Sequence, residues 1–128
     1  MRLSLLLILL CSITGCYKTT RNCKDYKTGT FRFDYMVDGV AKSGNFKRTE
    51  RYSINFYDGK TDSSEVKWIN DCEFVLYKIN PKSIAEKDPI HMKILTTTDS
   101  SYTFEYAKAS FNEGEPKRKE KGTAIKID

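Results

Sequence analysis

The chain has 128 residues, with 22 Lys and Arg against 17 Asp and Glu, which gives a net charge of +5. This length allows one domain of ordinary size and excludes a multidomain machine. The content of 12% aromatic residues argues against a disordered protein. The one histidine excludes a site that needs two imidazoles from the same chain. We therefore expect one folded domain, and the scarcity of histidine argues against an enzyme.

The N-terminus has the pattern of a secretory signal. Arg2 supplies a positive charge, and residues 3–10 are almost wholly apolar. This run is about half of the roughly 20 residues that a transmembrane helix needs. Residues 1–15 are therefore predicted to be a signal peptide that is removed. Its removal would lower the net charge by one, because Arg2 is its only charged residue.

The sequence Ile13-Thr14-Gly15-Cys16 resembles the lipobox of bacterial lipoproteins. In that family the cysteine is lipidated and the chain is cut before it. The resemblance implies that Cys16 is the lipidation site and that an N-terminal lipid anchors the protein to a membrane of the cell envelope. In some bacterial lipoproteins a short acidic stretch after the cysteine accompanies export to the cell surface. No acidic run follows Lys18, so the resemblance implies the outer membrane, with the protein facing the periplasm. The alternative is an ordinary signal peptide with a chance cysteine.

Two further cysteines, Cys23 and Cys72, belong to the mature chain, since Cys11 lies in the signal. In an oxidising envelope compartment a pair suggests one disulfide. The loop would hold about 50 residues, for which the chain-entropy model gives roughly 4 kcal/mol. Two free thiols and a metal site are the alternatives. The spacing is not Cys-x-x-Cys and only His91 offers an imidazole, so we expect neither a metal nor a cofactor.

Apolar and polar residues alternate along most of the remaining chain, the pattern of half-buried β-strands. Asp-Gly pairs at 38–39 and 58–59 and an Asn-Asp pair at 70–71 are typical of tight turns between antiparallel strands. We predict a tether at 16–27 and an all-β domain at 28–128, an antiparallel up-and-down meander of seven or eight strands. The expected strands are 30–37, 44–57, 66–68, 72–77, 90–98, 102–106 and 123–127.

A meander of this length fits either a small lipocalin-like barrel or a two-sheet sandwich, and closure into a barrel would remove exposed sheet edges.

The longest expected strand raises a question of register. Its apolar face carries Tyr52, Ile54 and Phe56. Regular alternation would place Arg48 and Glu50 on this same face. Either these two are polar groups inside a cavity, or a bulge shifts the register between them and the apolar residues.

Two segments, 23–31 and 66–74, each hold one cysteine of the predicted pair. They resemble small uncharacterised lipoproteins of Bacteroidota, and the strand order loosely resembles lipocalin-like proteins. The Gly-x-Trp motif of true lipocalins is absent, since the only tryptophan, Trp68, is mid-chain. Proteins of this kind sometimes carry the label DNA topoisomerase IV. The chain has neither a Gly-rich ATP-binding loop nor an acidic metal cluster, and we do not expect nucleic acid as a partner.

The leading functional expectation is a non-enzymatic envelope lipoprotein with a binding or structural role. One alternative is a carrier of a small apolar ligand, with Tyr52, Trp68, Tyr102 and Tyr106 lining a cavity; these side chains would otherwise fill the core. A second is an inhibitor or partner of an envelope enzyme, which would need an exposed apolar patch. A third is a hydrolase around His91, which would need an orienting carboxylate and a nucleophile nearby.

Overall fold

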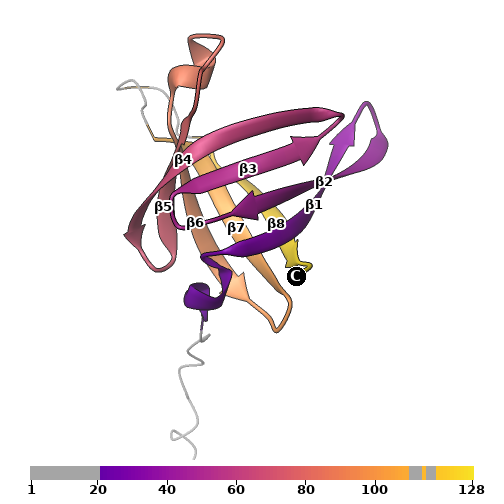
Figure 1. Ribbon diagram of the computed structural model, residues 1–128, viewed down its shortest axis with the longest axis vertical. Coiled ribbons are helices and arrows are strands. Elements are labelled where there is room, and N and C mark those ends of the chain that lie inside the picture. The colour runs from indigo at the N-terminus through magenta and orange to yellow at the C-terminus, as the bar shows by residue number, and fades with distance from the viewer. Residues whose placement is uncertain (1–20, 110–113, 115–117) are drawn as a thin grey trace, which may run out of the picture.

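Eight antiparallel strands, paired in chain order, form a closed barrel (Figure 1). The computed structural model describes residues 21–109, 114 and 118–128, so the signal segment and Cys16 lie outside the described residues. The strands are β1 (Gly29–Val37), β2 (Val40–Arg48), β3 (Tyr52–Tyr57), β4 (Lys60–Asn70), β5 (Glu73–Lys78), β6 (Ile90–Thr97), β7 (Ser101–Lys108) and β8 (Glu120–Lys126). The predicted all-β meander is confirmed. The pairing of Phe33 in β1 with Ala124 in β8 closes the sheet, so the fold is a barrel and not a sandwich.

The two predicted Asp-Gly turns are confirmed by their backbone. Asp38 and Gly39 join β1 to β2 with φ values of 49° and 77°, and Asp58 and Gly59 join β3 to β4 with 50° and 68°. Positive φ at both central residues matches the right-handed twist of the flanking strands, and an Asp-Gly pair tolerates it well. These local sequences therefore set the register of two of the hairpins.

The single strand predicted over 44–57 is wrong, because a turn at 49–51 divides it into β2 and β3. The Thr49 hydroxyl accepts a hydrogen bond from the Tyr52 amide at 3.0 Å, and the Thr49 amide donates to the Tyr52 carbonyl at 2.8 Å. This turn contains neither Gly nor Pro, so the alternation of residue types runs across it without a visible break. A side chain-to-backbone hydrogen bond replaces the usual turn residues.

The turn reverses the predicted faces of β3. Arg48 is paired with Ser53, and both side chains point into the barrel. Tyr52 and Phe56 lie on the outer surface, 41% and 48% exposed. Glu50 lies in the exposed turn. Of the two readings offered for the polar pair, the interior position therefore holds for Arg48 and fails for Glu50.

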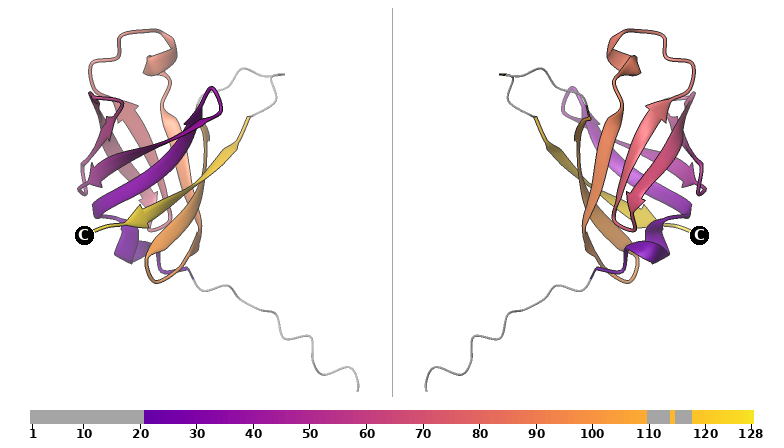
Figure 2. Two further views of the ribbon diagram at one scale, coloured as in Figure 1. Left: turned by 90° about the vertical axis from the view of Figure 1, so that its right-hand side faces the viewer. Right: turned by 90° about the vertical axis from the view of Figure 1, so that its left-hand side faces the viewer.

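The buried core lies at one end of the barrel, which we call the closed end. A 3₁₀-helix, η2 (Cys23–Tyr26), crosses this end, and a second, η3 (Ala85–Lys87), lies in the β5–β6 connection at the opposite, open end (Figure 2). No helix among the described residues is long and apolar enough to cross a membrane. The core cluster consists of Cys23, Tyr26, Phe31, Phe46, Ile94, Tyr102 and Ala124. Thus η2, which falls within the predicted tether, packs against the barrel.

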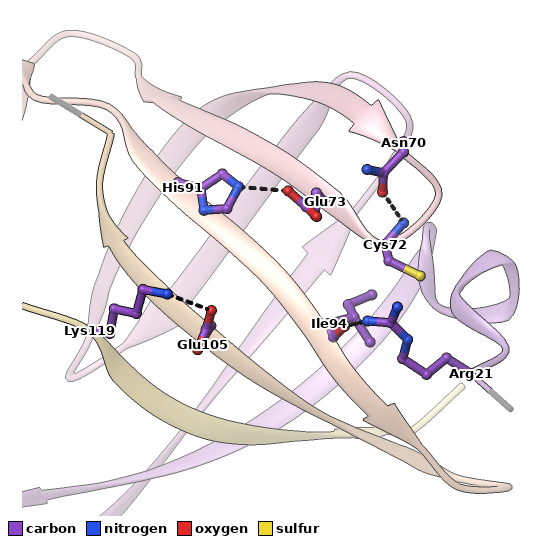
Figure 3. A network of polar contacts seen from close by, with 8 residues as sticks. All are labelled: Arg21, Asn70, Cys72, Glu73, His91, Ile94, Glu105 and Lys119. Carbon is purple, nitrogen blue, oxygen red and sulfur yellow. Dashed lines mark hydrogen bonds and ion pairs between the residues drawn. The ribbon is translucent and has the colours of Figure 1, made fainter. Parts of the chain in front are cut away.

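The predicted disulfide between Cys23 and Cys72 is present, with the two Cα atoms 5.2 Å apart. It joins η2 to the turn between β4 and β5. The Cys72 amide donates to the Asn70 side-chain oxygen at 2.9 Å, and Arg21, just before η2, donates to the Ile94 carbonyl at 2.9 Å (Figure 3). These contacts hold η2 across the closed end.

Candidate functional site: a cavity above a buried arginine

The open half of the barrel contains a cavity of about 380 Å³ that opens to solvent. Such a volume lies within the range of small-molecule sites. Most of the lining is apolar or aromatic, as expected for inward-facing strand positions. The lining residues are Phe33, Tyr35, Phe46, Arg48, Ser53, Asn55, Tyr57, Phe74, Leu76, Met92, Tyr102, Phe104 and Tyr106.

Two glycines in the wall help to leave this space open. Gly44 faces Phe33 across β1 and β2, and Gly122 faces Phe104 across β7 and β8. A Cβ at Gly44 would lie 2.5 Å from the Phe33 ring, and one at Gly122 would lie 2.7 Å from the Phe104 ring. Each ring therefore rests directly on the backbone of its neighbouring strand. Rings placed against the wall take up less of the lumen than rings that project into it.

Tightly packed aromatic side chains close the bottom of the cavity. The Phe31 ring stacks on Phe46 with centroids 4.9 Å apart and meets the edge of Tyr102 at 5.6 Å. Tyr26 of η2 packs on Tyr102 at 5.3 Å, and its hydroxyl donates to the Thr98 carbonyl. Burial raises the pKa of the Tyr26 hydroxyl, with Asp25 and Asp99 adding to the shift. This packed layer is the floor of the cavity.

Arg48 sits in the floor and is only 3% exposed. Its Nε donates to the Lys27 carbonyl at 3.0 Å, its Nη2 donates to the Tyr26 carbonyl, and its Nη1 donates to the Tyr102 hydroxyl at 3.1 Å. Two of these acceptors are backbone oxygens at the end of η2. The guanidinium therefore ties the helix to the inside of the barrel while it also lines the cavity.

Aromatic rings surround the Arg48 guanidinium, and no described carboxylate pairs with it. Ring faces attract a cation, and the attraction grows when water is excluded. The nearest ring, that of Phe74, has its centroid 4.8 Å from the guanidinium carbon. Burial raises the pKa of the Tyr102 hydroxyl, and the Arg48 charge opposes this shift. The rings within 5.8 Å belong to Phe31, Phe46, Trp68, Phe74 and Tyr102.

A narrow polar strip runs from the floor along β3. Ser53, paired with Arg48, and Asn55, the next inward residue, both line the cavity. Within the part of the chain that the structure describes, neither side chain has a hydrogen-bond partner. The strip therefore offers a ligand polar groups on one side of an otherwise largely apolar wall.

The mouth of the cavity is lined by half-buried tyrosines, among them Tyr106. Its hydroxyl donates to Glu120 at 2.9 Å, and burial together with this carboxylate raises its pKa. Beside the mouth, Lys78 contacts Asp62 at 3.2 Å and Glu86 of η3 at 3.0 Å. The ion pair with Glu86 holds the β5–β6 connection against the barrel.

The predicted cavity residues are distributed differently from expectation. Tyr102 and Tyr106 line the cavity, whereas Tyr52 lies on the outer surface and its assignment is wrong. Trp68 lies near the floor, 5.8 Å from Arg48, but does not line the cavity. Its buried indole N–H has no acceptor among the described residues. The sequence did indicate Arg48 as a candidate, because alternation along the strand placed it on an apolar face.

His91 lies on the outer face of β6, away from the cavity. Its Nε2 is 3.1 Å from Glu73, and the neighbouring Lys119 contacts Glu105 at 3.3 Å (Figure 3). Glu73 is the kind of carboxylate that orients a general base. Throughout the described ranges, no group of three or more His, Cys, Asp or Glu is placed to hold a metal ion. The cavity, and not this pair, is therefore the stronger candidate site.

Comparison with known proteins does not assign the chain to a family. No family model, curated protein or solved structure matches it. The fold itself is a small eight-stranded antiparallel barrel with an aromatic cluster, and this arrangement is compatible with a binding role.

Proposed function

We propose that this protein is a non-enzymatic envelope lipoprotein whose barrel binds a small, largely apolar ligand. The observation that carries the proposal is the open cavity of about 380 Å³, with its mainly apolar and aromatic lining. A core packed solid would have removed the carrier hypothesis, because it leaves no room for a ligand. Because the floor is closed and the mouth is open, a ligand would enter through the mouth.

The proposed anchor fits this geometry. The described chain begins with Arg21 at the closed end, only five residues after Cys16. Five extended residues span on the order of 20 Å at most, so a lipid on Cys16 would hold the closed end near the membrane. The mouth would then face away from that membrane. Intact mass of membrane-extracted protein tests the anchor: we expect loss of residues 1–15 plus acyl mass, and an uncleaved, unacylated chain would contradict it.

The alternative of a partner for an envelope enzyme rests on exposed apolar side chains. Met36 and Val40, 66% and 58% exposed, lie at the β1–β2 hairpin. Nothing among the described residues shows what covers this hairpin, whereas the cavity has a defined volume and lining. The binding proposal is therefore the one that the geometry supports best.

The binding proposal can be tested with N-phenyl-1-naphthylamine, a neutral apolar dye that fluoresces when it leaves water. The full chain with Cys16→Ser is used, so that the anchor's own acyl chains cannot compete. We expect saturable binding of one dye per barrel. Leu76→Trp places bulk in the cavity and should weaken binding by about tenfold, equivalent to roughly 1.4 kcal/mol.

The matched control is Val75→Trp. Val75 is the neighbouring residue in β5, on the opposite face from Leu76, and it does not line the cavity. This variant should bind the dye like the unsubstituted barrel. Absence of saturable binding, or equal loss in both variants, would contradict binding in the cavity.

A further inference from the structure

The floor of the cavity holds a positive charge that no described carboxylate neutralises. Arg48 lines the cavity and is 3% exposed. Its contacts within the described ranges are two backbone carbonyls, one hydroxyl and aromatic rings. Burying an ion without an opposite charge is costly, and such neutral partners compensate for only part of the cost. An anion at the floor would supply the missing compensation.

The floor also has hydrogen-bond donors that are not in use. A guanidinium carries five N–H groups, and three of those in Arg48 are engaged. The Tyr102 hydroxyl accepts a bond from Arg48, so its own hydrogen remains available. Ser53 lies beside Arg48 without a described partner for its hydroxyl. These groups surround one end of the cavity with donors, as an anionic head requires.

Above the floor, the wall suits an apolar chain. Aromatic and aliphatic side chains face the lumen from several strands, and the polar strip is confined to one side. The apolar wall residues are Phe33, Phe46, Phe74, Leu76, Met92 and Phe104. A ligand with its charged head at the floor and its apolar part directed toward the mouth matches this distribution of polarity.

Resting on the proposed function, we infer that the ligand is an amphiphile with a single anionic head, and that Arg48 determines this specificity. The planar fork of a guanidinium fits a carboxylate, which can accept two parallel N–H bonds. Tyr102 and Ser53 donate further hydrogen bonds to the head. The apolar chain lies between the aromatic walls and ends at the mouth.

The first test compares decanoate with decan-1-ol, which share a chain length and differ in charge. Binding is measured at neutral pH on the full chain with Cys16→Ser. The only tryptophan, Trp68, lies 5.8 Å from Arg48, so its emission reports on occupancy of the floor. We expect decanoate to bind at least about tenfold more tightly, the effect of hydrogen bonds to a charged group. Equal affinities overturn the inference.

The second test removes the charge. Arg48→Met should weaken decanoate at least about tenfold and leave decan-1-ol unchanged. The matched control is Lys60→Met, which loses one positive charge at the exposed start of β4. It should alter neither affinity. Equal loss of decanoate in both variants overturns the assignment to Arg48, because the effect would then come from the overall charge.

Tyr102→Phe keeps the inference testable if Arg48→Met does not fold. It retains the ring in the floor and removes one donor, so decanoate should weaken by about threefold to tenfold and decan-1-ol should not. An unchanged preference overturns the proposed head site.

The dye separates failure of this inference from failure of the proposed function. If N-phenyl-1-naphthylamine still binds when the preference for decanoate is absent, only the anionic specificity is overturned. If neither the dye nor the two decyl probes bind, the proposed function is overturned together with the anionic specificity.

Discussion

The two ends of the barrel use the same alternation of aromatic residues, yet one is filled and the other is hollow. At the closed end, Phe31 is fully buried and Tyr102 is 1% exposed. At the open end, Tyr35, Tyr57 and Tyr106 are only half-buried and line a cavity of about 380 Å³. The same residue types therefore form a packed core in one half and the wall of a cavity in the other.

The difference between the ends arises from what covers them. The disulfide and Arg48 hold η2 over the closed end, and Tyr26 fills the space beneath it. At the open end, glycine opposite Phe33 and Phe104 lets these rings rest against the wall. The buried packing is thus concentrated where the barrel is closed, and the other half keeps an open cavity.

Removal of the disulfide should lower the free energy of unfolding more than the other changes, because it loosens η2 at the closed end. Cys23→Ala combined with Cys72→Ala opens a loop of 49 residues, for which the chain-entropy model gives about 4 kcal/mol of unfolding free energy. Denaturant unfolding measures the loss. The unsubstituted protein under reducing conditions should lose a similar amount. A loss below about 1 kcal/mol in both cases would show that η2 does not depend on the bridge.

Gly44→Ala should give a smaller loss of stability, which arises from a clash in the cavity wall. The added methyl would lie 2.5 Å from the Phe33 ring, and such overpacking typically costs about 1–3 kcal/mol. Asn45→Ala, exposed on the same strand, is the control and should change stability little. Combining Gly44→Ala with Phe33→Leu should recover part of the loss. Strict additivity of the two substitutions would contradict the contact.

The smallest effect is expected at the β5–β6 connection. The Lys82 amide and Lys78 hold the pKa of Glu86 below its ordinary value. The ionised carboxylate therefore stabilises the β5–β6 connection fully above its ordinary pKa of about 4.3. This stabilisation is lost as the pH falls through the lower pKa of the folded state. Glu86→Gln should reproduce the loss at neutral pH.

Hydrogen exchange at the Lys82 amide, which donates to Glu86 at 2.6 Å, measures this loss. We expect protection to fall by about twofold to fivefold, as for an exposed ion pair, with global stability unchanged. Glu50→Gln, in the exposed turn at 49–51, is the control and should leave this amide unaffected. A fall in global stability would show that the connection is part of the cooperative core and not a separable element.

Much of the fold was predictable because it depends on local or periodic features. Alternation indicates strands, and Asp-Gly at 38–39 and 58–59 forms turns with the φ values that such pairs favour. The pairing of Cys23 with Cys72 followed from the count of cysteines outside the predicted signal peptide and lipidation site. The turn at 49–51 was missed because a threonine hydroxyl forms it, and no Gly or Pro marks it.

The sequence by itself thus determined an all-β meander, its Asp-Gly hairpins and its disulfide, since each depends on neighbouring residues or on a simple count. Only the tertiary structure decided which face of β3 points inward, and it thereby placed Arg48 in the cavity floor and Tyr52 outside. Whether inward aromatic residues fill a core or leave a cavity depends on closure of the sheet and on what covers each end. Those are contacts between residues far apart in the chain, such as η2 with Arg48, and no local pattern contains them.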